Sequence, residues 1–134
     1  MDALTQILRD TIQAADRAIT AEDFDALMTF YTDDASLVVK PGLTVSGKDG
    51  IRRAFVAIAD HFNHSIVVTQ GAMQVIPAGD VALVVMETLL QVSDASGATS
   101  DMTRRATYVF RNIAGSWLCA VDNSYGTSLL DAGL

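Results

Sequence analysis

The hydrophobic pattern of this chain changes from a mainly helical period to a strand-like one at about residue 65. Before that point apolar residues recur at steps of three and four, which places them along one face of a helix. After it the chain consists of long runs rich in β-branched residues, which are typical of strands. Helices first and strands later is the pattern of an α+β domain in which helices cover one face of a sheet.

Three helices are expected in the first half of the chain. Each has an apolar stripe at helical spacing, such as Phe24, Leu27 and Met28 in the second. A short β-rich run at 35–40, closed by the Pro41-Gly42 turn, separates the second helix from the third. The expected helices are residues 2–19, about 21–32 and about 47–62.

Four long strands are expected in the second half. The segments between them are short and consist of turn-forming residues. Short turns force consecutive strands into antiparallel hairpins, so the four strands should form a meander. The expected strands are residues 65–76, 80–92, 99–111 and 116–125.

The length of 134 residues suits a single domain spanning 1–134, because folding a chain of this size buries roughly two-thirds of its unfolded surface. Half of the residues are apolar and 19% are charged, as in ordinary globular proteins. The net charge of -7 opposes binding to nucleic acid or to an anionic membrane surface. We therefore expect a globular domain whose partners are neither nucleic acid nor membrane.

Cysteine usage and the amino-terminal segment bear on the cellular compartment. Cys119 is the only cysteine, so an intrachain disulfide is impossible and a reducing compartment is the simpler assumption. Residues 1–9 lack a basic segment followed by an apolar run, and no stretch of about 18 consecutive apolar residues occurs. These observations predict a soluble, cytoplasmic protein.

Four short sequence words occur in an order that is more specific than any one of them. They are AEDFDAL at 21–27, FYTDDA at 30–35, SGKDGIR at 46–52 and GSWL at 115–118. Together with the order helix, helix, strand, helix and four strands, they make the chain resemble the NTF2-like superfamily over nearly its whole length. Within that superfamily it looks closest to the SnoaL-like and DUF4440-type bacterial proteins, many of which lack an assigned activity.

This resemblance implies an NTF2-like (cystatin-like) cone, in which three amino-terminal helices pack on a curved antiparallel sheet and enclose a pocket. It also implies a homodimer formed through the outer sheet face. The family includes ketosteroid isomerases, which use a base aspartate and an oxyanion hole of tyrosine and protonated aspartic acid. The matching positions here are Val39, Ala15 and Thr107, so none of these roles is filled and isomerase chemistry of that kind is not expected.

Strand side chains alternate between two faces, so the resemblance also predicts which residues point into the pocket. The fork of Arg105 suits an anionic or carbonyl oxygen of a ligand, and Glu87 would orient that ligand or serve as a base. The alternative is a structural ion pair between Glu87 and Arg105. Tyr31 fits either the pocket or the core. A shift of one residue would exchange the whole set for the other face. The candidate ligand-binding residues are Tyr31, His61, Glu87, Arg105, Thr107, Asn123 and Tyr125.

Other reactive side chains lack the partners that catalysis or metal binding needs. His61 and His64 lie near the end of a helix, where the dipole favours them, and Asp60 adds no complete ligand set. Asp122 is interpreted as a solvated residue at the sheet edge. No nucleophile motif surrounds the serines or the cysteine. We therefore expect neither a metal nor a cofactor.

The opposite face of the expected sheet is too apolar for contact with water, which indicates a partner surface. Identical sheets can pair about a two-fold axis, so a homodimer is expected. The residues assigned to this outer face are Met86, Thr88, Leu90, Ala106, Tyr108, Phe110, Leu118 and Ala120.

Two hypotheses of function follow. In the first, the pocket binds a small, partly apolar, anionic or carbonyl-bearing molecule, with acid/base chemistry of the lyase, isomerase or cyclase type as an open extension. In the second, the chain is a non-catalytic association module whose cavity is vestigial and filled by side chains. Arg105 separates the two, because a binding protein should present it to the cavity and a relic should hold it against Glu87. The sequence leaves open whether the protein is an enzyme.

Overall fold

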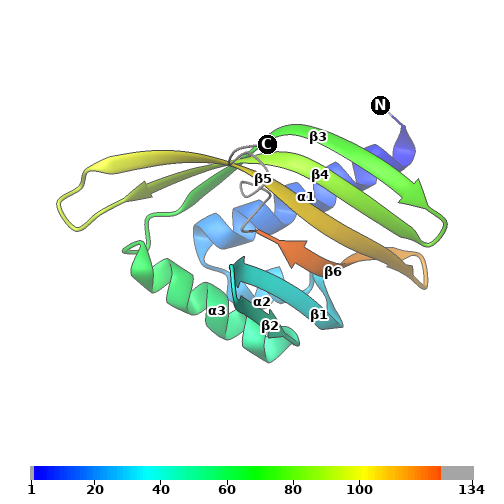
Figure 1. Ribbon diagram of the computed structural model, residues 1–134, viewed down its shortest axis with the longest axis horizontal. Coiled ribbons are helices and arrows are strands. Elements are labelled where there is room, and N and C mark those ends of the chain that lie inside the picture. The colour runs from blue at the N-terminus through cyan, green and yellow to red at the C-terminus, as the bar shows by residue number, and fades with distance from the viewer. Residues whose placement is uncertain (1, 125–134) are drawn as a thin grey trace.

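The computed structural model describes residues 2–124, in which helices cover one face of a long, curved sheet (Figure 1). The elements follow in the order α1 (Ala3–Ala21), α2 (Phe24–Met28), β1 (Tyr31–Lys40), β2 (Leu43–Ser46), α3 (Lys48–His61), β3 (Val67–Ala78), β4 (Val81–Ser93), β5 (Thr99–Ile113) and β6 (Ser116–Asn123). The expected α+β class and the order of helices before long strands are confirmed.

The strands form one open, six-stranded sheet in the order β2-β1-β6-β5-β4-β3. Strands β3 to β6 make the antiparallel meander that the short turns predicted. Strand β1 lies beside β6 in parallel register, and β2 pairs with β1 at the sheet edge. The late meander is thereby joined to the first half of the chain.

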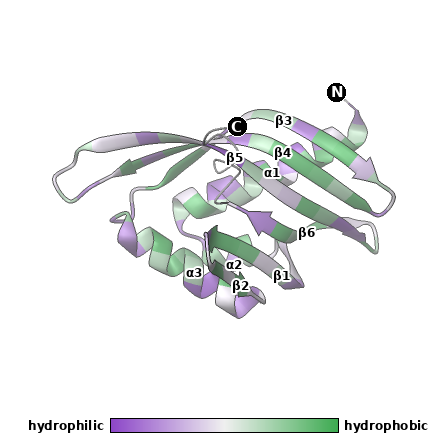
Figure 2. Ribbon diagram, viewed as in Figure 1, coloured by the Kyte–Doolittle hydropathy of each residue, from purple (hydrophilic) through white to green (hydrophobic). Residues whose placement is uncertain are grey.

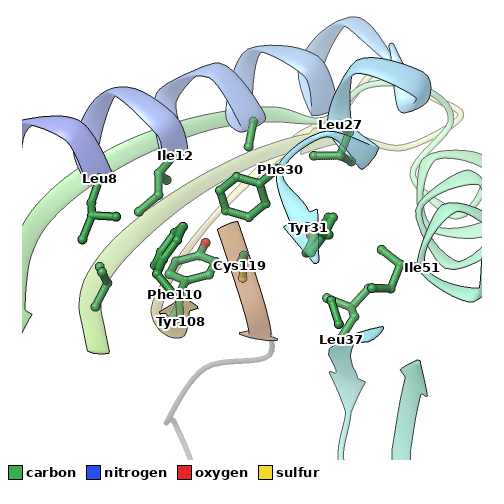
Figure 3. Packing of buried hydrophobic residues seen from close by; sticks show 14 of the residues in the cluster. Leu8, Ile12, Leu27, Phe30, Tyr31, Leu37, Ile51, Tyr108, Phe110 and Cys119 are labelled. Atoms are coloured by element: carbon green, nitrogen blue, oxygen red, sulfur yellow. The ribbon is translucent and has the colours of Figure 1, made fainter. Parts of the chain in front are cut away.

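Helix α1 lies across the concave side of the sheet and packs mainly against β3. It begins where Asp2 caps the backbone NH of Thr5 at 2.7 Å, and it ends where Glu22 turns into the left-handed region at φ 57°. Its buried face includes Leu8 and Ile12, which point toward the sheet (Figure 3). The helical stripe read from the sequence is therefore the face that the sheet covers.

The second helix is shorter than expected. The prediction of a helix over about 21–32 is wrong at its end, because α2 stops at Met28 and the chain enters strand β1 at Tyr31. The backbone carbonyl of Phe30 accepts the NH of Cys119 at 2.9 Å, so tertiary pairing with β6 takes over from helix propensity. Strand β1 consequently begins four residues before the expected strand at 35–40.

The Pro41-Gly42 turn leads into a strand that the sequence pattern did not reveal. Strand β2 is only four residues long and pairs with β1 as a hairpin across this turn, where Gly42 adopts φ 80°. Helix α3 then spans Lys48–His61, within one residue of its expected ends. The hairpin and α3 pack together and form one side of the molecule (Figure 1).

The hydrophobic core fills the space between α1, α2, α3 and the sheet (Figure 3). Phe30 stands edge-on to Tyr31 at a centroid distance of 5.0 Å and to Phe110 at 5.5 Å. Hydrophobic and hydrophilic residues follow each other at short intervals along α1 and α3 (Figure 2). This is the pattern of an amphipathic helix, which turns one face to the sheet and the other to solvent. Full burial of each such side chain contributes roughly 1.5–3 kcal/mol.

In residues 2–124, no helix is both long enough and apolar enough to cross a lipid bilayer.

Candidate functional site

The concave side of the sheet holds a cavity of about 700 Å³. It lies between α1, α3, the β1–β2 hairpin and the inner faces of β4 and β5. Its volume falls in the range of sites that enclose small organic ligands. Most of the wall is apolar and includes Ile19, Leu37, Phe55, Ile58, Leu90 and Met102.

Two groups of polar side chains interrupt this apolar wall. One group carries a carboxyl or hydroxyl function and is buried or half-buried: Asp16, Thr88, Tyr108 and Ser124. The other group carries basic nitrogen: Lys40, Arg53, His61 and Arg104. The cavity is thus an apolar space with a few polar groups, which is the usual composition of a site that orients one ligand.

Among the described residues, Asp16 carries the one carboxyl group that lines the cavity. It projects from the buried face of α1 and is only 8% exposed. Burial raises its pKa to about 7; a hydrogen bond from Gln70 opposes the rise, and the nearby charge of Asp122 adds to it. Near neutral pH Asp16 is therefore present in both protonation states, which is what a group that donates and accepts protons requires.

A second buried carboxyl, Asp122 on β6, stands behind the cavity wall. It is 3% exposed and accepts hydrogen bonds of 2.6 Å from the hydroxyl of Tyr31 and 2.6 Å from that of Ser124. Burial raises the pKa of Asp122 to about 6, although both hydrogen bonds oppose the rise. Ser124 also lines the cavity, so its hydroxyl connects the cavity wall to this carboxyl.

Two further hydroxyl groups lie on the cavity wall. Within residues 2–124, the Oγ1 atom of Thr88 is buried and makes no hydrogen bond. Tyr108 is close enough for Thr88 to lower the pKa of its phenol slightly, but the two hydroxyls do not meet hydrogen-bond geometry. Burial dominates and raises the pKa of Tyr108 well above its usual value, so the phenol stays neutral and available as a donor.

The predicted pocket set on β4 and β5 faces the other way. The cavity is lined by Thr88 and Leu90, whereas Glu87 lies on the outer face and covers Gly71, where an added Cβ would come within 2.8 Å of the Glu87 Cβ. Arg105 and Thr107 lie outside the cavity wall as well. The predicted alternation was correct in period and wrong by one residue in phase, which exchanges the two faces.

The same error affects the surface assigned to a partner. Most of the residues placed on the outer face are buried or line the cavity instead: Met86, Thr88, Leu90, Ala106, Tyr108 and Phe110. The actual outer face carries exposed apolar side chains from β3, β4 and β6: Val67, Ile76, Val81, Leu83, Leu89 and Val121.

On β6 no single alternation holds, because the strand contains an irregularity. Val109 pairs with Val121 but Phe110 pairs with Cys119, so the register shifts by one residue between them. Cys119 and Asp122 are therefore both buried, and Asn123 turns to the outer side, where its amide donates to Thr107 at 3.1 Å. The interpretation of Asp122 as a solvated sheet-edge residue is wrong for the same reason.

The remaining predicted site residues have mixed outcomes. His61 lines the cavity. Tyr31 is 1% exposed and belongs to the core, with its hydroxyl on Asp122. Tyr125 lies outside the described residues. Of the three positions matched to the isomerase residues, Val39 lines the cavity, whereas Ala15 and Thr107 are not on its wall.

The histidine pair at the end of α3 divides between two surroundings. His64 contacts Glu22 at 2.7 Å and Asp60 at 3.2 Å, and the hydrogen bond to Glu22 raises its pKa. His61 faces the cavity instead. Within residues 2–124, no group of three or more histidine, cysteine, aspartate or glutamate side chains is arranged to hold a metal ion.

The two buried carboxyls were missed by the sequence interpretation, but one had a visible signal. Asp16 interrupts the apolar stripe of Ile12, Ala15 and Ile19, where a charged residue has no structural reason to lie. Asp122 had no such signal, because it is buried by the register shift on β6, and the sequence does not reveal that shift.

Comparison with known proteins identifies the family. The model of the SnoaL-like domain matches residues 8–120, which is most of the chain. The chain belongs to the SnoaL-like domain family. This confirms the resemblance to the NTF2-like superfamily. Among the solved structures that this chain resembles, two are described as having a cystatin-like fold and another as belonging to the NTF2-like family.

Several solved structures share the fold at low sequence identity. Aln2 from a Streptomyces species is 16% identical with a TM-score of 0.82, covering 92% of this SnoaL-like chain and 90% of that one. A ketosteroid isomerase-like protein from Erwinia carotovora atroseptica is 19% identical with a TM-score of 0.77, covering 92% and 95%. The association domain of CaMKII from C. elegans is 19% identical with a TM-score of 0.73, covering 90% and 94%. No curated protein matches the chain.

Proposed function

We propose that this SnoaL-like protein binds a small, largely apolar, carbonyl-bearing molecule in the cavity and transfers a proton on it, with Asp16 as the acid/base group. The observation that carries this proposal is a carboxyl that is 8% exposed, faces a cavity and has a pKa raised by burial to about 7. Strongly perturbed carboxyls in cavities are typical of catalytic sites.

The surroundings of Asp16 suit proton transfer next to a carbonyl group. Removing such a proton places negative charge on the carbonyl oxygen, and neutral hydroxyl donors stabilise that charge. Thr88 and Tyr108 supply hydroxyls to the wall of the same cavity. The Thr88 hydroxyl has no hydrogen-bond partner within residues 2–124. This set differs from the isomerase set, whose positions fall here on Val39, Ala15 and Thr107.

The open volume of the cavity also supports binding over the rival hypothesis. A vestigial cavity would be filled by side chains, but this one retains about 700 Å³. Arg105, which was expected to separate the two hypotheses, does not line the cavity and so bears on neither. The separating residue is instead Asp16, because an apolar side chain would stabilise a relic better at that position.

The test is proton exchange in heavy water. Wild-type protein is incubated with a panel of apolar ketones and β-dicarbonyl compounds, and the loss of α-proton signals is followed by NMR. We expect Asp16→Asn to reduce the protein-dependent exchange by about a hundredfold or more, since a general base contributes on that order. Asp10→Asn, an exposed acid on the same helix, should exchange like wild type.

Binding is measured in parallel with the fluorescent apolar probe phenylnaphthylamine, which Asp16→Asn should retain. The proton-transfer role is wrong if compounds that bind the cavity show no exchange above background, or if Asp16→Asn exchanges them as fast as wild type.

We also propose that two copies associate through the outer face of the sheet. Six exposed apolar side chains gather on that face, including Leu83 and Leu89 on β4 and Val121 on β6. Glu87 and Arg105 lie opposite each other in the register of the same face, so its charges are self-complementary about a two-fold axis. The similarity to a CaMKII association domain is compatible with this role.

Sedimentation should therefore show a dimer at micromolar concentration, and Leu83→Glu should convert it to a monomer because it places a charge in the centre of an apolar contact. Ile7→Glu is the matched control, since Ile7 is also an exposed apolar residue but lies on α1, away from the sheet face. A wild-type monomer at this concentration would show that the outer face does not mediate self-association.

A further inference from the structure

Charge is distributed very unevenly between the cavity and the rest of the protein. The chain has 16 acidic and 9 basic residues, yet the cavity is lined by three of the basic ones, Lys40, Arg53 and Arg104. Among the described residues Asp16 is the one acidic side chain on the wall, and burial keeps it partly neutral. A cavity with positive charge in an acidic protein attracts anions selectively.

The arginines of α3 differ from one another in a way that points to the cavity. Arg52 faces outward and forms an ion pair with Asp25 at 3.0 Å, and Lys48 pairs with Asp33 at 3.4 Å. Arg53 lines the cavity, and within residues 2–124 it forms no ion pair. The outer cations of α3 are therefore paired with carboxylates, whereas the cation that faces the cavity has no carboxylate partner within residues 2–124.

Arg53 lies on α3 beside the apolar wall of the cavity. Ala57 and His61 follow it at intervals of four residues and also line the cavity, so the three lie along one face of the helix. Lys40 lines the cavity from the β1–β2 hairpin, which packs against α3. Most of the remaining wall offers only apolar contact. A ligand that contacted both the two cations and the apolar wall would therefore be amphipathic.

We propose that the ligand of this cavity is an amphipathic organic anion, whose acidic group is held by Arg53 with Lys40 while its apolar body fills the cavity. The arginine fork suits a carboxylate, a sulfonate or a phosphate, each of which offers two oxygens. This inference rests on the binding function proposed above but not on proton transfer by Asp16. It adds that the substrate carries negative charge in addition to its carbonyl group.

Two probes with one aromatic body test the inference. Anilinonaphthalene sulfonate carries an anionic group, and phenylnaphthylamine is the same body without it. Wild type should bind the sulfonate more tightly, and Arg53→Gln should weaken its binding about tenfold while leaving the neutral probe unchanged. Added salt should weaken the sulfonate in wild type more than in Arg53→Gln. Arg52→Gln, one residue away and outside the cavity, should affect neither probe.

A blocking variant shows whether the probes occupy the cavity. Ala54→Trp would place an indole into it from α3 and should abolish binding of both probes. If Arg53→Gln leaves the sulfonate unchanged, or weakens both probes equally, the anion inference is wrong. If the neutral probe binds and the sulfonate is not preferred, this inference fails alone. If neither probe binds wild type, the proposed binding function fails with it.

Discussion

Replacing Asp16 with asparagine should raise the free energy of unfolding at about pH 8 by roughly 3 kcal/mol. Burial raises the pKa of Asp16 from 3.8 to about 7, so ionising this group costs more in the folded protein than in the unfolded chain. Each pKa unit corresponds to about 1.4 kcal/mol, which sets an upper value near 4 kcal/mol. Asparagine has nearly the same shape and carries no charge, so the folded protein no longer bears the free-energy cost of a buried ionised carboxyl.

The sign of the pH dependence follows from the same shift. Below the unfolded pKa of 3.8 the carboxyl is neutral in both states, and its full contribution to stability is present. Between that value and about 7 the folded state binds more protons than the unfolded state, so stability falls as the pH rises. The difference between Asp16→Asn and wild type should therefore be small at about pH 4 and largest at about pH 8.

Urea unfolding of both proteins across this pH range measures the effect. Asp10→Asn, on the exposed side of the same helix, serves as the control and should leave the profile unchanged. A difference between Asp16→Asn and wild type that stayed constant with pH would mean that the stability change does not come from ionisation of Asp16.

Removing the hydroxyl of Tyr31 should have the second large effect, with the opposite sign. Tyr31→Phe deletes one of the two side-chain hydrogen bonds that the buried carboxyl of Asp122 accepts within residues 2–124. A hydrogen bond to a charged group contributes roughly 1.5–3 kcal/mol, so we expect a loss of about 2 kcal/mol at about pH 8. The pKa of Asp122 should rise further above its present value of about 6, because this hydrogen bond lowers it.

The loss should shrink at low pH. At about pH 4 the carboxyl of Asp122 is protonated, and the missing bond then involves a neutral group, which costs less. Denaturation of Tyr31→Phe at the two pH values measures the difference. Tyr108→Phe is the comparison, because the Tyr108 hydroxyl is not hydrogen-bonded to a carboxyl in the described part of the chain. An equal loss for Tyr31→Phe at both pH values would argue against an ionised Asp122 at the higher pH.

The predicted gain in stability on replacing Asp16 is itself an argument about function. A buried carboxyl that lowers the stability of the fold is the kind of residue that proteins retain at sites where chemistry requires it. Asp122 differs in degree, because hydroxyls of Tyr31 and Ser124 both donate to it, and its pKa is raised only to about 6. Of the two carboxyls, Asp16 is the one that lines the cavity.

The secondary structure could be predicted closely from the sequence where local pattern controls it. Helix α1 and α3 and the described ends of the four long strands agree with expectation to within two residues. The failures lie where distant segments decide the outcome. Tyr31 leaves its expected helix because β1 pairs with β6, and β2 exists because a short segment finds a partner across the Pro41-Gly42 turn.

The period of side-chain alternation along a strand can be read from local sequence, but which of its two faces meets the helices cannot. The spacing of apolar residues on β4 and β5 was sufficient to show that these are strands with two distinct faces, and together with the resemblance it was sufficient for the family. Both faces of β4 are apolar, because Leu83 and Leu89 lie on the outer face opposite Val84 and Met86 on the inner face. Pattern alone therefore could not say which face meets the helices.

The sequence by itself thus determined the fold class, the family and the acidic character of the protein, because each depends on composition, on local periodicity or on short words. Only the tertiary structure decided which residues line the cavity. The packing of α1 against β3 chose the inner face, the register shift in β6 buried Asp122, and α3 turned Arg53 toward the cavity. These are contacts between segments far apart in the chain, and they place Asp16 and Arg53 in one site where no local pattern joins them.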